Sequence, residues 1–264
     1  MVESIRELNK ICQKPNYRTV GNWYVRNILR DAALPMTWLL LHTGVSANQV
    51  TFFSFLVASL GGLSYVIPGA GPFLVSALLL QFWYYLDHVD GQIARYRKTA
   101  SMTGRFLDFM THHLVHLVLF FALGYYAYKA LAREIFLLWG SVSSLAILAF
   151  NLIHDVKYKT FYERCCRDGA VIKKSSQGSK KTEQPKSFWR KAFSLAHKSC
   201  EIHVMINVLA GAALLQFVTV WDLRVLLFFY YGTVAPVVFG VKFFYIICSQ
   251  AIDTEYGCFT CQKS

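Results

Sequence analysis

Charged residues are scarce in this chain. Asp, Glu, Lys and Arg make up 16% of the 264 residues, whereas a soluble globular domain usually carries about a quarter. Hydrophobic residues make up 55%. This shortage of charge disfavours an ordinary soluble domain and indicates a protein that buries much of its surface in lipid.

Acidic residues are rarer than basic ones. The chain has 15 Asp and Glu against 27 Lys and Arg, which gives a formal net charge of +12. No basic stretch is interleaved with aromatic side chains that could stack on bases, so we expect no nucleic-acid partner. In a membrane protein, the same excess arises from cytosolic loops and from contacts with lipid headgroups.

Neither end of the chain carries a decisive targeting or ligand-binding signal. The first residues have no apolar core, so no cleaved signal peptide is expected. The seven cysteines fall mostly in segments expected to be cytosolic, which predicts free thiols. Cys258 and Cys261 form a lone CxxC pair, which is weak evidence for metal binding or lipidation and leaves their role open.

Long apolar runs predict an all-α integral membrane fold with six transmembrane helices. Each run is near the ~20 residues that a bilayer requires. They cover residues 48–67, 72–94, 105–128, 133–154, 201–219 and 224–247. Before them, residues 1–47 form a cytosolic or interfacial segment. In it, Val20 to His42 alternates charged and apolar positions as an amphipathic interfacial helix does, and Pro35 could kink that helix.

The placement of basic residues orients the predicted bundle. Residues 1–47 hold six Lys and Arg, and residues 155–199 hold twelve. By the positive-inside rule, both termini and the connection between the second and third runs face the cytosol. We therefore expect a catalytic membrane domain over 48–247 with a basic cytosolic loop at about 156–199, flexible at Ser175–Pro185, and a cytosolic tail over 248–264.

Carboxylates interrupt the apolar runs between residues 87 and 112. Asp87 and Asp90 lie near the end of the second run, and Asp108 lies in the third. Residues three or four apart share one face of a helix, so a tight hairpin can bring the three together. Small residues and imidazoles share the same faces: Gly91, Ala94, Gly104, His112 and His116. Ionisable groups at membrane depth are costly and usually mark an ion or substrate site.

Such a set of side chains suits a divalent metal. Carboxylates in a low-dielectric site repel one another unless a cation compensates them, and hard divalent cations prefer oxygen ligands. Two Mg²⁺ or Mn²⁺ ions about 4 Å apart can clamp a diphosphate and stabilise a leaving oxygen. Small residues let a nucleotide approach the backbone, although they also serve helix packing in membranes.

The same residues resemble a known signature. The chain reads Asp87-x-x-Asp90-Gly91-x-x-Ala94-Arg95-x8-Gly104-x3-Asp108-x3-His112. This resembles the motif of the CDP-alcohol phosphotransferases at every fixed position except the last, where the family has a fourth aspartate. Upstream, Ser46 to Thr51 weakly resembles the family's Pro-Asn-x-x-Thr segment, with Ala47 in place of proline.

The resemblance implies an enzyme of phospholipid or related lipid biosynthesis. Such enzymes transfer a phosphatidyl or phospho-alcohol group from a CDP-linked donor to an alcohol and release CMP. The implied metal ligands are Asp87, Asp90, Asp108 and His112. The implied CDP site comprises Gly91, Ala94, Arg95, Gly104, Asn48 and Thr51. The donor could be CDP-diacylglycerol or a small CDP-alcohol, and a homodimer is left open.

His112 is the departure that matters. In the family, the fourth aspartate is taken to be the base that activates the acceptor hydroxyl. Imidazole can accept a proton near neutral pH and can ligate a metal, so the implied catalytic pair is His112 and Asp108. The substitution lowers the negative charge of the site, which favours Mn²⁺ or another imidazole-tolerant ion, or an acceptor that brings its own negative charge.

Two other functions compete with the enzyme. A degenerate family member would bind lipid or nucleotide without turnover. A cation or proton transporter would continue the polar residues across the bilayer, but Leu117 to Ala127 holds no acid or histidine. The apolar stretch disfavours transport.

Overall fold

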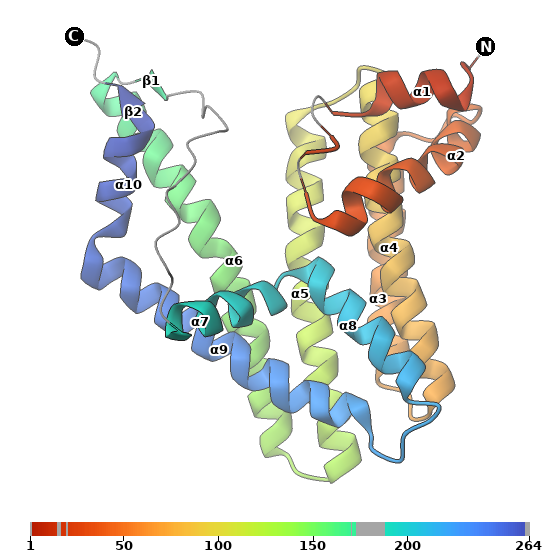
Figure 1. Cartoon of the computed structure of the whole chain (residues 1–264), viewed down its shortest axis with the longest axis vertical. Helices are drawn as coiled ribbons and strands as arrows, with labels where there is room; N and C mark the ends of the chain where they lie inside the picture. Colours follow the sequence, from red (N-terminus) through yellow and green to blue (C-terminus); the bar gives the residue numbers. More distant parts are fainter. Residues whose placement is uncertain (1, 15–16, 20, 170, 173–187, 262–264) are drawn as a thin grey trace.

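A computed structural model describes residues 2–14, 17–19, 21–169, 171–172 and 188–261, and these are almost wholly helical (Figure 1). The helices are α1 (Ile5–Cys12), the π-helical turn η1 (Val25–Leu29), α2 (Arg30–Leu41), α3 (Ala47–Tyr65), α4 (Ala70–Tyr96), α5 (Met102–Leu131), α6 (Ile135–Asp168), α7 (Phe188–Ser199), α8 (Ile202–Leu215), α9 (Leu223–Ser249) and α10 (Ala251–Phe259). Two-residue strands, β1 (Val171–Ile172) and β2 (Thr260–Cys261), pair antiparallel. The all-α class is confirmed.

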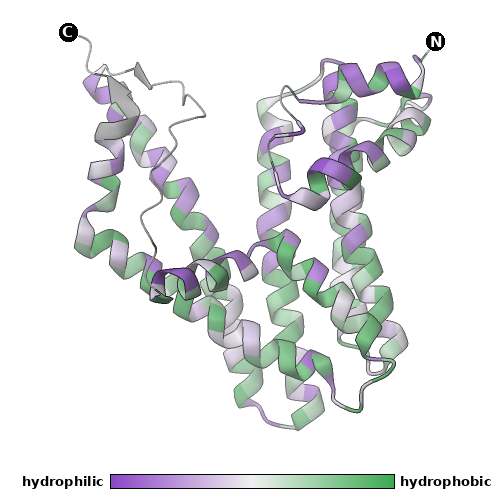
Figure 2. Ribbon diagram, in the orientation of Figure 1, coloured by the Kyte–Doolittle hydropathy of each residue, from purple (hydrophilic) through white to green (hydrophobic). Residues whose placement is uncertain are grey.

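Fewer helices than expected have the length and apolar composition needed to cross a membrane. Among the described residues, α5, α6 and α9 are long and apolar enough to cross a membrane, and α7 with α8 would make a fourth span bent by 77°. The six expected runs do coincide with α3, α4, α5, α6, α8 and α9. A count of six spans is therefore not confirmed, although Figure 2 shows that α8 and α9 are largely hydrophobic whereas α1 and α7 are largely hydrophilic.

The α4–α5 hairpin is set by local capping. Ser101 is the N-cap of α5, and its Oγ accepts a hydrogen bond from the Gly104 amide at 3.0 Å. Ser46 caps α3 in a reciprocal box, because its Oγ accepts from the Gln49 amide and Gln49 Oε1 accepts from the Ser46 amide at 2.8 Å. These bonds satisfy amides that a helix start leaves unpaired. They place the first turns of α3 and α5 at the same end of the bundle as the last turns of α4 (Figure 1).

Small residues bring α5 and α6 into close contact. A Cβ added to Gly124 or Gly140 would lie 2.4 Å from the other glycine's Cα. Beside this crossing, Ser144 Oγ donates a hydrogen bond to the Leu117 carbonyl at 2.8 Å. Glycine allows such an approach because it has no side chain, as is common between membrane helices.

The N-terminal segment packs against α4. Helix forms over much of the expected Val20–His42 region, as η1 and α2, with Pro35 inside α2. Thr37 Oγ1 donates to Gln92 Oε1 at 2.6 Å, and Gln92 Nε2 donates to the Arg30 carbonyl at 2.8 Å. Helix α1, which the sequence analysis did not expect, precedes it. A position in the membrane interface stays a prediction.

The basic segment 156–199 is helical at both ends. Helix α6 continues to Asp168, and α7 occupies the other end, while the expected flexible centre, Ser175–Pro185, lies outside the described residues. Helix α10 packs on the extension of α6 through an ion pair between Lys157 Nζ and Glu255 Oε2 at 2.7 Å. Five described cysteines carry free thiols; the side chains of Cys258 and Cys261 lie outside the described part.

Candidate active site

Three of the predicted ligand residues meet across the α4–α5 hairpin. His112 Nε2 lies 2.8 Å from Asp87 Oδ1 and 3.3 Å from Asp108 Oδ1. One ligand atom from each residue lies within 4.8 Å of the others. Two carboxylate oxygens and one imidazole nitrogen form a donor set that suits a divalent transition metal such as Mn²⁺. The three side chains therefore fit one divalent cation.

The imidazole of His112 is held from two sides. Because an ionised carboxylate only accepts hydrogen bonds, the short contact with Asp87 requires a proton on Nε2. The ring also packs edge-on against Trp83, with centroids 5.1 Å apart. The contact joins α5 to α4 and places an imidazole between two negatively charged groups.

Asp90 has a different environment. Its side chain is buried, and Oδ2 accepts a hydrogen bond from Thr51 Oγ1 at 2.5 Å. Thr51 is itself buried in the first turns of α3. This bond links two predicted site residues that are far apart in the chain, and it leaves Asp90 outside the three-residue cluster.

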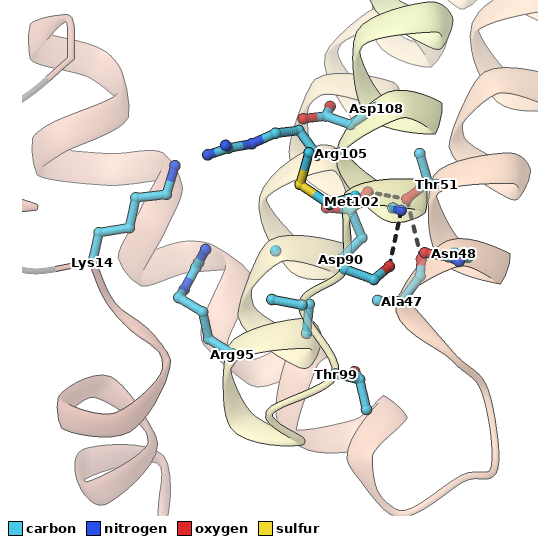
Figure 3. Close-up of a pocket in the computed structure, with 15 residues that line it drawn as sticks. Lys14, Ala47, Asn48, Thr51, Asp90, Arg95, Thr99, Met102, Arg105 and Asp108 are labelled. Atoms are coloured by element: carbon cyan, nitrogen blue, oxygen red, sulfur yellow. Dashed lines mark hydrogen bonds between the residues drawn. The ribbon is translucent and has the colours of Figure 1, made fainter. Parts of the chain in front are cut away.

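A pocket of about 400 Å³ opens beside these carboxylates (Figure 3). It contains all six residues of the implied CDP site: Asn48, Thr51, Gly91, Ala94, Arg95 and Gly104. Asp90 and Asp108 also line it. The structure thus brings the implied nucleotide residues and two of the implied metal ligands to one cavity.

The two glycines of the motif explain part of the pocket's shape. A Cβ on Gly104 would lie 3.0 Å from Asn48 Oδ1, so a larger residue would press on the Asn48 side chain. A Cβ on Gly91 would lie 3.1 Å from Arg95 Nη1. Arg95 is further held because its Nε donates to the Cys12 carbonyl of the N-terminal segment.

A second pocket, of about 200 Å³, lies on the other side of the motif. It shares a wall with the larger pocket, made of Lys14, Asp90, Gly91, Arg95 and Asp108. Its own lining is Gln13, Arg30, Asp87, His88 and Gln92. His112 lines neither pocket and contacts the site through Asp87 and Asp108.

Other polar residues in the helices serve contacts between helices. His113 Nε2 lies 2.9 Å from Asp155 Oδ2, and His116 Nδ1 lies 2.9 Å from the Asn151 amide nitrogen. Lys242 Nζ lies 4.2 Å from the centre of the Phe150 ring. None of the five polar residues lines either pocket: His113, His116, Asn151, Asp155 and Lys242.

The sequence analysis missed the contribution of the N-terminal segment. Gln13, Lys14 and Arg30 line the pockets although they precede the motif by more than fifty residues. Nothing in their spacing signals this, because the contact depends on how α1 and α2 fold back on α4.

Comparison with known proteins covers the same region. Residues 44–172 match the family model described as CDP-alcohol phosphatidyltransferase. This segment, just under half of the chain, is therefore similar to the CDP-alcohol phosphatidyltransferase family. The match contains the whole stretch from Asp87 to His112 and the start of α3.

Two relatives place the family match in context. The bifunctional IPC transferase and DIPP synthase of Archaeoglobus fulgidus is 28% identical over 143 residues, which is 53% of this chain and 28% of that protein's length. The crystal structure of Mycobacterium tuberculosis phosphatidylinositol phosphate synthase (PgsA1) with CDP-DAG bound is similar at a TM-score of 0.50 and 17% identity. That similarity covers 81% of this chain and 90% of the other, and it shows the fold alone.

Proposed function

We propose that the protein is an integral membrane phosphotransferase that moves a phosphatidyl or phospho-alcohol group from a CDP-linked donor to an alcohol acceptor and releases CMP. The observation that carries the proposal is the convergence of the motif. Residues from α3, α4 and α5 line one pocket, and the carboxylates stand in its wall, inside the family-matched segment. The product would enter phospholipid or related lipid biosynthesis.

The larger pocket is the proposed donor site. Gly91, Ala94 and Gly104 leave backbone accessible to a nucleotide, and Asn48 offers an amide at the pocket wall. Arg95 brings a positive charge that stabilises a diphosphate. The proposed donor is CDP-diacylglycerol or a small CDP-alcohol.

Asp87, Asp108 and His112 would hold a divalent ion, Mg²⁺ or Mn²⁺, and Asp90 would complete the set for a second. When bound, such ions polarise the transferred phosphoryl group and neutralise charge on the leaving CMP. Without a cation, the protein offsets this negative charge with the His112 imidazole and the Thr51 hydroxyl. The three-residue donor cluster supports at least one ion site.

In the proposed reaction, the acceptor's hydroxyl oxygen forms a bond to the transferred phosphorus while the bond from that phosphorus to the CMP oxygen breaks. The hydroxyl proton passes to a base. Asp108 lines both pockets, so it can reach an acceptor, and His112 contacts Asp108 from behind. We propose that Asp108, which faces the substrate, takes this proton and that His112, through its Nε2–H, orients and stabilises the carboxylates.

We also propose that all six apolar helices cross the membrane, with the active site and both termini in the cytosol. The motif hairpin, α1 and the end of α6 lie at one end of the molecule (Figure 1), and the sequence concentrates its Lys and Arg in residues 1–47, 95–105 and 155–199. Cysteine labelling of intact cells and inverted vesicles tests the orientation. Accessibility of Lys98→Cys from outside intact cells would contradict it.

The activity is tested with purified protein in lipid nanodiscs. Release of CMP is measured from CDP-diacylglycerol and from CDP-choline, each with Mg²⁺ or Mn²⁺ and a panel of polar and lipid alcohols. The proposal expects metal-dependent CMP release that disappears in Asp90→Asn and Asp108→Asn. Tight donor binding without CMP release under every condition would instead show the non-catalytic alternative.

A further inference from the structure

Three cationic side chains converge on the opening of the larger pocket. Figure 3 shows the charged ends of Lys14, Arg95 and Arg105 turned toward the same space. They come from three separate segments: the N-terminal segment, the end of α4 and the start of α5. Lys14 and Arg95 also line the smaller pocket, so they stand at the junction of the two cavities.

These cations share the pocket wall with Asp90 and Asp108 but are not paired with them. Within the described residues, none of the three forms an ion pair. Arg105 lies one helical turn from Asp108 and still does not pair with it. Because the neighbouring aspartates are the proposed metal ligands, the three unpaired cations are left to bind a further anion.

The surroundings of Lys14 support this reading. The residue as a whole is exposed, yet the positive charge of Arg95 acts on its ammonium group. Its pKa is lowered from the usual lysine value, first by burial and then by the positive charges of Arg95 and Arg30, which outweigh the opposing effect of Asp108 and Asp87. A bound anion would remove this unfavourable balance.

We propose that Lys14 and Arg105 form a clamp for a phosphate group at the junction of the two pockets, with Arg95 beside them. The proposal rests on the function proposed above and assigns part of the active site to the N-terminal segment. Two sources carry the required chemistry, namely the diphosphate of the donor and a phosphate on the acceptor. Arginine and lysine both bind phosphate oxygens through charge-assisted hydrogen bonds.

The test is a set of binding measurements on the full-length protein in phosphatidylcholine nanodiscs, which contain no anionic lipid. Calorimetric titration gives Kd for CDP, CMP, inorganic pyrophosphate and sn-glycerol 3-phosphate, with Mn²⁺ present. The variants are Lys14→Met, Arg105→Met and the double variant, with Lys14→Arg and Arg105→Lys as conservative forms. Lys10→Met, an exposed lysine on α1 away from both pockets, is the matched control.

Loss of one charged hydrogen bond is expected to weaken phosphate binding about 10-fold or more. If the clamp holds the donor, CDP and pyrophosphate weaken in Lys14→Met and Arg105→Met while CMP changes less. If it holds the acceptor, sn-glycerol 3-phosphate weakens and CDP is unaffected. In either case Lys14→Arg and Arg105→Lys retain most of the affinity, and Lys10→Met matches the native protein.

The clamp is wrong if the double variant binds all four probes within twofold of Lys10→Met. A failure of the proposed function has a different signature, because the native protein would then bind pyrophosphate but show no preference for CDP and no CMP release. Thermal unfolding of each variant confirms that altered affinity does not come from an altered fold.

Discussion

His112 and Asp87 are hydrogen-bonded across the α4–α5 hairpin, with Nε2 2.8 Å from Oδ1. The bond ties the last position of the Asp87–His112 stretch to its first aspartate. A fourth aspartate at this position would face Asp87 and Asp108 as a third negative charge, whereas the imidazole donates a hydrogen bond to Asp87. The substitution therefore changes how the site balances charge before any metal binds.

Replacing His112 separates the roles proposed for it. His112→Ala is expected to lower the rate of CMP release about 100-fold or more, the usual contribution of a positioned acid or base. His112→Asp is expected to turn over faster than His112→Ala. Its metal preference is expected to shift toward Mg²⁺, because a carboxylate replaces the imidazole ligand. Rates are measured with each metal. Unchanged turnover in His112→Ala would remove His112 from the reaction.

Metal removal should stop the reaction reversibly. Dialysis against EDTA is expected to abolish CMP release, and Mn²⁺ is expected to restore it at a lower concentration than Mg²⁺, since the three-residue cluster contains an imidazole nitrogen. A metal titration of the initial rate measures both. Turnover that survives EDTA treatment would rule out the metal proposal.

The Thr51–Asp90 hydrogen bond is expected to stabilise the empty site. Thr51→Val keeps the shape of the side chain but leaves a buried carboxylate without its donor, at a cost of about 1–3 kcal/mol. Chemical or thermal unfolding in detergent measures the loss, and Thr51→Ser, which keeps the hydroxyl, is the control. Equal stability of the valine and serine variants would show that the bond contributes nothing.

Gly104 is expected to control access of the donor. In Gly104→Ala, the new Cβ would lie 3.0 Å from Asn48 Oδ1, so Asn48 must move and the pocket must change shape. We expect KM for the CDP-linked donor to rise several-fold, with little change in stability. Gly211→Ala is a matched helical control, because no atom lies within 4 Å of its added Cβ. A normal KM in Gly104→Ala would show that Asn48 does not shape the donor site.

Gly124 and Gly140 are expected to permit the close packing of α5 against α6. Gly124→Ala places a Cβ 2.4 Å from the Gly140 Cα, and a backbone atom cannot move aside as a flexible side chain can. Overpacking of this kind costs about 1–3 kcal/mol or more. The melting temperature of Gly124→Ala, compared with that of Gly211→Ala, measures the effect. Identical melting temperatures would show that the helices separate without cost.

The helices and the residues of the motif were accessible from the sequence because both depend on local spacing. Apolar runs marked six segments that are helical in the structure, and capping residues such as Ser46 and Ser101 mark helix starts in a form that can be read along the chain. The motif from Asp87 to His112 placed its carboxylates on neighbouring helix faces. Helix α1 was missed because it is short and polar rather than long and apolar.

Only the tertiary structure decided which of these residues touch. Spacing could not show the hydrogen bonds from His112 to Asp87 and from Thr51 to Asp90. Nor could it show that Lys14 lines the larger pocket. These contacts join segments far apart in the chain, and they depend on the packing of α3, α4 and α5 and on the fold of the N-terminal segment against α4. The sequence by itself therefore determined the chemistry that the site contains, and packing across the helices decided which charges face one another.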